Sequence, residues 1–241
     1  MVSAVGTAST TDGNVGITAG WERVGGALGL LSVVVLVGGS ITFALPTSLT
    51  SSSTPSAISA YVSAHGSSVL TLTLTTVLGT AIGLWFIATV ARLIHQADSQ
   101  SPLGMIALAS GAVATAISAF DGVTLSVLVY LHRQGGPTDP ALVRALFDLQ
   151  NGLIMPGLFG FFVAGFLAAV GVAMIRGQFA RPWTGWFTLL LAALAIAGAA
   201  TGLTSVSGGT TLIGYSPVIS YGVFTVITSI YLLRARKSTG L

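Results

Sequence analysis

The sequence predicts an all-α integral membrane protein, a polytopic bundle of six transmembrane helices with both termini in the cytoplasm. Three observations predict this fold class. Only 6% of the residues are charged and 53% are hydrophobic, whereas a soluble domain carries roughly 25% charged residues because its surface must stay solvated. Six apolar runs are long enough to cross a membrane, and most basic residues lie at one set of their ends.

Each apolar run is bounded by charged or turn-forming residues. A hydrocarbon core of about 30 Å requires about 20 apolar residues in a helix. The first run exceeds the roughly 7–15 apolar residues of a signal peptide, so we expect it to be a retained span. The runs cover residues 24–45, 69–91, 103–131, 152–175, 183–206 and 217–233, and the last, with 17 residues, is the shortest.

The chain divides into a tail and one membrane domain. Residues 1–20 are rich in Ser, Thr and Gly without periodicity, which predicts a disordered N-terminal tail. The inner connections, 92–102 and 176–182, are too short to hold a cytoplasmic domain. Residues 21–241 are therefore predicted to form a single six-helix transmembrane domain.

The basic residues set the predicted orientation. Arg133 and Arg144 lie at one set of helix ends. Seven lie at the other: Arg23, Arg92, Arg176, Arg181, Arg234, Arg236 and Lys237. Because cytoplasmic loops carry the excess of Lys and Arg, the second set is predicted to be inside. All four tryptophans lie toward that side, and Tyr61, Tyr130, Tyr215 and Tyr221 lie toward the other.

Two short interfacial helices are predicted on the outer side. Thr54 can cap a helix that begins at Pro55, since proline is favoured at the first helical position. Four residues then share one face of this helix: Ile58, Tyr61, Val62 and His65. Thr138 or Asp139 before Pro140 repeats the pattern, and this second helix is expected to run into the fourth span with a kink near Pro156.

Three pairs of glycines at GxxxG spacing predict close helix packing. They are Gly25/Gly29, Gly79/Gly83 and Gly198/Gly202. In lipid, small residues let helix backbones approach and so stabilise their association. Two interpretations stay open, a tight monomeric bundle and a homodimer formed through one of these faces.

Asp121 is the candidate catalytic residue. It lies within "TAISAFDGVTLSVLVYL", ten residues before the outer end of its span, or about 15 Å deep at 1.5 Å per residue. Burying a carboxylate there is costly, so the group should face the bundle and be paired or protonated. Because no span contains Lys or Arg, we expect a neutral acid that can donate a proton.

Hydroxyl groups are the other polar side chains within the spans. Ser118 and Thr124 share the Asp121 stripe, and further stripes contain Thr73, Thr76 and Thr80 or Tyr221, Thr225 and Thr228. The predicted substrate-binding residues are Ser118, Thr124, Thr76, Thr80, Tyr221, Thr225, Asp148 and Asn151. The alternative is that the hydroxyls bond to their own helices and Asp121 locks two helices together.

Asp148 and Asn151 stand near the outer mouth of the fourth span, beside Gln150. They could form the mouth of a ligand cavity. The alternative is that Asp148 forms a surface ion pair with Arg144 at i, i+4, worth a few tenths of a kcal/mol.

Composition argues against several function classes. The absence of cysteine excludes disulfides, thiolate metal sites and iron–sulfur clusters. A net charge of +3 is too small an excess to indicate nucleic-acid binding. His65 and His132 lack the spacing of a zinc site, so we expect no metal and no cofactor.

Four segments carry a resemblance to a known family: "SAISAYVSAHGSSVL", "LWFIATVARLI", "DPALVRALFDLQNGL" and "ARPWTGWFTLLLAALA". Across residues 54–203 the chain resembles an uncharacterised bacterial family of small six-span membrane proteins, a domain of unknown function. The resemblance implies a six-helix fold in a bacterial inner membrane and no established reaction.

Together these features predict a membrane protein with an intramembrane pocket for a small lipophilic ligand, surrounded by membrane lipid. The candidate activity is a metal-independent isomerase or cyclase with Asp121 as general acid, since such chemistry needs a proton donor and a site that excludes water. The alternatives are a small proton-coupled transporter and a non-enzymatic structural or regulatory subunit. A cavity open to lipid favours the first, a path to both faces the second, and a filled core the third.

Overall fold

The computed structural model describes residues 12–42, 49, 52–135, 139–150, 157–177, 180–204 and 213–234, with the side chains of the first helix described over 20–40. These residues form seven helices and no strand. The helices are α1 (Asp12–Thr42), α2 (Pro55–Ala97), α3 (Leu103–Arg133), α4 (Pro140–Asp148), α5 (Gly160–Ile175), α6 (Pro182–Thr204) and α7 (Ser216–Arg234).

Every helix except α4 is long and apolar enough to cross a membrane. The six predicted spans are therefore confirmed, including the shortest, which corresponds to the 19 residues of α7. The chain is an all-α, multi-pass membrane protein. We call the end of the bundle where Arg92, Arg176, Arg181 and Arg234 lie the basic end, and the opposite end the α4 end.

Helix α1 begins earlier than predicted. It starts at Asp12 and so takes in residues 12–20, which were predicted to belong to a disordered tail. Once a helix is nucleated, each further residue adds one backbone hydrogen bond, and no proline interrupts the segment between Asp12 and Trp21. The helix of the first span therefore continues toward the N-terminus beyond the apolar run.

Helix α2 joins the first interfacial helix to the second span. The side chain of Thr54 accepts a hydrogen bond from the backbone amide of Ala57, and Pro55 occupies the first turn, as predicted. The helix bends at His65, whose backbone is non-helical at φ −120° and ψ 20°. The His65 ring stacks on Tyr61 at 4.4 Å between centroids.

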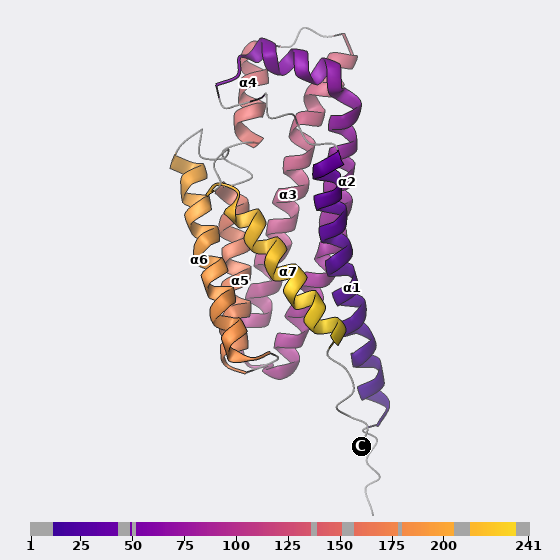
Figure 1. Cartoon of the computed structure of the whole chain (residues 1–241), viewed down its shortest axis with the longest axis vertical. Helices are drawn as coiled ribbons and strands as arrows, with labels where there is room; N and C mark the ends of the chain where they lie inside the picture. Colours follow the sequence, from indigo (N-terminus) through magenta and orange to yellow (C-terminus); the bar gives the residue numbers. More distant parts are fainter. Residues whose placement is uncertain are drawn as a thin grey trace, which may run out of the picture.

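The start of α2 lies across the α4 end of the bundle, close to α4 (Figure 1). Three residues of its predicted apolar face are buried in a cluster with α3 and α4: Ile58, Tyr61 and Val62 pack with Leu125, Leu128, Val129, Val143 and Phe147. Asp139 caps α4 by accepting from the amide of Ala141 at 2.9 Å. Thr138, Asn151 and Pro156 lie outside the described residues, so the predicted kink is not described either.

The larger core cluster involves α2, α3, α5, α6 and α7, with Phe86, Phe166 and Phe224 among its buried side chains. The GxxxG pairs contribute to packing within the chain. A Cβ at Gly29 would overlap Ser229 of α7 and Phe86 of α2, one at Gly79 would overlap Leu36 of α1, and one at Gly198 would overlap Ser216. These faces are thus covered by other helices of the same chain, and the homodimer stays a prediction.

Candidate functional site

A cavity of about 360 Å³ lies within the membrane-spanning part of the bundle, between α1, α2, α3 and α7, with Phe159 at the start of α5. Glycine and apolar side chains form about half of the described wall. All the polar residues on this wall carry hydroxyl groups: Ser32, Ser40, Thr76, Thr80, Thr115, Ser118, Tyr215 and Tyr221. The described wall is therefore uncharged, and only hydroxyl side chains give it polarity.

The cavity opens toward the side of the bundle between α1 and α7. These two helices touch near the basic end, where a Cβ at Gly26 would lie 2.9 Å from the carbonyl oxygen of Ser229. Helix α7 crosses the bundle obliquely (Figure 1), so the two helices separate toward the α4 end. There the lining residues are exposed, with Val37 at 50% and Tyr215 at 51%. Most of the opposite wall, from α2 and α3, is buried, so the exposed part of the described rim lies on the outer surface of the bundle.

Aromatic side chains close the cavity toward the basic end. We call Phe86, Phe166, Tyr221 and Phe224 the aromatic floor. Tyr221 contacts Phe159 and Phe166 at centroid distances of 6.4 and 6.2 Å, and Phe166 contacts Phe224 at 5.5 Å. Phe86 and Phe166 are completely buried. These rings therefore fill the described part of the bundle on the basic-end side of the cavity.

Most threonines of the cavity satisfy their hydroxyl groups within their own helix. Thr76 and Thr80 donate to the carbonyl oxygens of Leu72 and Thr76, both at 2.9 Å, and Thr115 donates to Gly111 and Ala112. The alternative interpretation of the threonine stripes is confirmed for these residues. Thr73 differs, because it also donates to the carbonyl oxygen of Gly122 on α3 at 2.5 Å.

The hydroxyl group of Tyr221 is the exception on the cavity wall. It is buried and makes no hydrogen bond of good geometry, and its one described polar contact is with the Thr225 hydroxyl on the same helix. It lies beside Gly83, where a Cβ would be 3.4 Å from the Tyr221 oxygen, so the absence of a side chain leaves room there. Thr225, one turn further along α7, is also buried and does not line the cavity. Tyr221 therefore offers the cavity a hydroxyl group that can form a further hydrogen bond.

Asp121 is buried, with 6% of its surface exposed, as its predicted position facing the bundle requires. The Gln150 side chain hydrogen-bonds to its carboxyl group, while Oδ1 has no partner. Thr124 donates to the backbone carbonyl oxygen of Asp121 at 2.6 Å. Asp121 is absent from the described cavity wall and lies three residues beyond Ser118, about 4.5 Å along the helix axis.

Asp148 forms the ion pair predicted as its alternative role. Its Oδ2 accepts from Nε of Arg144 at 2.7 Å, and both side chains are about one-third exposed. Arg144 also donates to the carbonyl oxygen of Ser53 at 3.0 Å, which ties α4 to the segment before α2. Such partly exposed pairs contribute little to stability, so this contact chiefly positions α4.

The structure thus brings together four of the predicted substrate-binding residues: Thr76, Thr80, Ser118 and Tyr221. Thr124, Thr225 and Asp148 lie away from the described wall, and Asn151 is outside the described residues. The prediction missed the wall from α1, with Ser32 and Ser40, as well as Thr115 and Tyr215. The two serines, eight residues apart in an apolar run, were the available signal.

The arrangement can hold an uncharged, largely apolar molecule and offer it a hydrogen bond from Tyr221. Among the described residues, no group of three His, Cys, Asp or Glu side chains could hold a metal ion. Comparison of the chain with models of protein families, with curated proteins and with solved structures finds no match. The resemblance to a bacterial six-span family therefore stays a prediction.

Proposed function

We propose that this protein binds a small lipophilic molecule with one hydrogen-bonding group, which enters the cavity from the membrane between α1 and α7. The cavity carries the proposal. Its volume of about 360 Å³ falls within the range of roughly 300–1,000 Å³ that is typical of small-molecule sites, which are mostly apolar with few polar groups. We further propose that the membrane is a bacterial inner membrane.

The Tyr221 hydroxyl supports the presence of a polar group on the ligand. A buried hydroxyl without a well-formed hydrogen bond costs up to about 1–3 kcal/mol. A phenol hydroxyl can donate or accept, so an oxygen or nitrogen atom of the ligand would recover this energy. The uncharged wall favours a neutral ligand, because no described group on it would compensate a buried charge.

An isomerase or cyclase that uses Asp121 as general acid is the finer form of this proposal. A general acid must lie within about 2.6–3.2 Å of the atom that it protonates, or reach it through one water. Since Asp121 lies one turn beyond Ser118, the ligand would have to extend past Ser118 toward Gln150. If Asp121 acts as the general acid, the Asp121→Asn protein should still bind the ligand but should not convert it. Loss of ligand binding together with turnover would contradict a role in catalysis alone.

A proton-coupled transporter is supported less well. Transport requires access to both membrane faces, and the aromatic floor closes the cavity toward the basic end. A non-enzymatic subunit with a filled core would lack the cavity itself. The lipid-facing opening therefore favours the ligand-binding proposal over both.

The test is to purify the protein in mild detergent and identify the bound small molecules by mass spectrometry, with a cavity-filling variant for comparison. Thr80 is buried on the cavity wall and its hydroxyl bonds only to its own helix, so Thr80→Leu should fill space at little cost. Thr204→Leu is the matched control, because Thr204 is exposed and also bonds to its own helix.

The expected result is a lipophilic compound that is enriched with the wild type and the control but lost from Thr80→Leu. Cavity filling commonly stabilises a protein, so the thermal stability of this variant should be unchanged or higher. That separates loss of the ligand from loss of the fold. The same compounds in equal amounts from all three proteins would contradict the proposal.

A further inference from the structure

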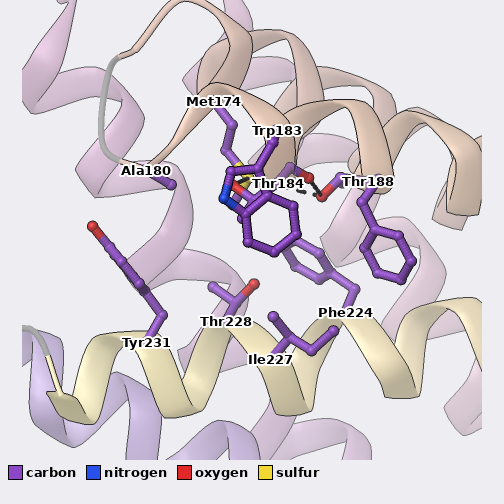
Figure 2. A pocket seen from close by; sticks show the side chains of 10 residues that line it. Met174, Ala180, Trp183, Thr184, Thr188, Phe224, Ile227, Thr228 and Tyr231 are labelled. Carbon is purple, nitrogen blue, oxygen red and sulfur yellow. Dashed lines mark hydrogen bonds between the residues drawn. The ribbon is translucent and has the colours of Figure 1, made fainter.

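A second hollow lies at the basic end, on the lipid-facing side of the bundle between α6 and α7. It has a volume of about 160 Å³, and we call it the α6–α7 groove. Its floor consists of four buried residues: Met174, Thr188, Phe224 and Thr228. Figure 2 shows Trp183 and Thr184 of α6 facing Ile227 and Thr228 of α7 across it.

The walls of the groove are aromatic and exposed. Trp183 is 63% exposed, Tyr231 43% and Ile227 43%. Because these residues belong to two membrane-spanning helices, the groove is open to lipid. Aromatic side chains of this kind are enriched where the hydrocarbon core meets the headgroups.

The threonines on the α6 side leave little polarity in the groove. Thr184 donates to the carbonyl oxygen of Arg181 at 2.6 Å, and Thr188 donates to that of Thr184 at 2.8 Å. Both hydroxyls also lie within 3.6–3.7 Å of the Met174 sulfur. Apolar voids of about 150 Å³ take up small apolar molecules, so the groove suits a length of hydrocarbon chain.

The groove is separate from the cavity of the proposed function. Phe224 lines the groove, and Tyr221, one turn earlier on α7, lines the cavity. Phe166 packs against both rings, so this part of the aromatic floor divides the two spaces. An inference about the groove therefore does not depend on the proposed function.

Two arginines lie at the basic ends of the two helices that form the groove. Arg181 immediately precedes α6, and Arg234 is the last residue of α7, one turn beyond Tyr231. The sequence after Asp148 contains no Asp or Glu but includes five of the nine basic residues: Arg176, Arg181, Arg234, Arg236 and Lys237. No acidic side chain of α5, α6 or α7 can therefore neutralise the arginines.

We propose that the α6–α7 groove binds an acyl chain of an anionic phospholipid, whose phosphate group lies against Arg181 and Arg234. The aromatic groove supplies the contact for the chain, and the arginines supply the charge that complements the headgroup. Basic residues near a membrane surface favour anionic lipids by about 1 kcal/mol each, or about fivefold in relative affinity.

Tryptophan fluorescence in bilayers that contain brominated lipids tests this site. A variant that retains only Trp183, with the other three tryptophans replaced by phenylalanine, is reconstituted in phosphatidylcholine bilayers. One set of bilayers contains phosphatidylglycerol with brominated acyl chains, and a second set contains the same fraction of phosphatidylcholine with brominated acyl chains. A variant that retains only Trp186 is the control, because Trp186 is equally exposed at 65% but does not line the groove.

Brominated phosphatidylglycerol should quench Trp183 more strongly than brominated phosphatidylcholine does, with a relative affinity higher by about fivefold per arginine. For Trp186, the two brominated lipids should quench equally. The selectivity should disappear with R181Q and R234Q together and persist with Arg133→Gln, which lies at the α4 end. Equal quenching of Trp183 by both lipids would overturn the preference for an anionic headgroup. If brominated lipids quench Trp183 no more strongly than they quench Trp186, the proposal that an acyl chain binds in the groove would be overturned.

Discussion

Replacing Asp121 with asparagine should stabilise the protein. The Oδ1 atom of Asp121 and the Oε1 atom of Gln150 are both buried acceptors without a donor, although the two side chains are in hydrogen-bonding contact. Asparagine keeps the shape of aspartate and carries an N–H donor that can bond to the Gln150 oxygen, a donor that the carboxyl group has only when it is protonated. The variant also removes a carboxyl group for which the spans supply no Lys or Arg.

The size of the effect follows from this contact. At a pH where the wild-type carboxyl group is ionised, one additional hydrogen bond contributes about 1 kcal/mol, so Asp121→Asn should raise the free energy of unfolding by about 0.5–1.5 kcal/mol. At a pH where the carboxyl group is protonated, the two proteins should be about equally stable, because the acid also has a donor. Asp121→Leu should lower it by about 1–3 kcal/mol, because Gln150 would then lack any partner at this position. In a chain of about 150–250 residues, each kcal/mol corresponds to a change in Tm of about 2–4 °C.

Thermal unfolding of the wild type and both variants in the same mild detergent measures these changes. A double-mutant cycle with Gln150→Leu shows whether the two residues interact, since coupling between contacting groups is typically about 0.5–3 kcal/mol. If Asp121→Asn lowers the stability by more than about 1 kcal/mol, the carboxyl group is needed for structure. The reasoning would then be wrong, and the general-acid hypothesis would be dropped.

Three further substitutions test other contacts, each by thermal unfolding in detergent. Tyr221→Phe removes a buried hydroxyl that makes no hydrogen bond of good geometry and contacts only Thr225 on its own helix, so the stability of the ligand-free protein should change by less than about 1.5 kcal/mol. A larger loss would indicate a further protein partner for this hydroxyl. Gly185→Ala would place a Cβ 2.6 Å from the carbonyl oxygen of Gly171 and should lower the stability by about 1–3 kcal/mol. Gly222→Ala is the control, because Gly222 has open space around it and its replacement should not destabilise the protein. Equal effects of the two substitutions would contradict the close packing of α5 and α6. Asp139→Ala removes the α4 cap and should cost about 0.5–2 kcal/mol, and an unchanged Tm would contradict that role.

The membrane spans and the helix starts could be predicted because they depend on local features. Length and apolar composition determine whether a helix can cross the hydrocarbon core, and the described part of the chain contains six such helices. Thr54 with Pro55, and Asp139 with Pro140, begin helices for reasons contained within a few residues. The start of α1 at Asp12 was missed because helix extension needs no apolar residues.

The cavity wall could be predicted only in part, because the spans are apolar on every side. Such a helix does not show which face meets its neighbours, so the contribution of Ser32 and Ser40 from α1 was missed. The oblique path of α7 decides which turns border the cavity: Tyr221 lies on the wall and Thr225, one turn later, lies behind it. In the same way, Ser118 reaches the cavity, while Asp121 meets Gln150 instead.

The most direct test of the proposed function is a crystal structure of the protein isolated with its native lipids and crystallised in a lipid phase. We predict density for a single apolar molecule between α1 and α7, with a polar atom about 2.5–3.0 Å from the Tyr221 hydroxyl. A cavity filled by side chains, or a chain of ordered water molecules that passes the aromatic floor to the basic end, would contradict the proposal.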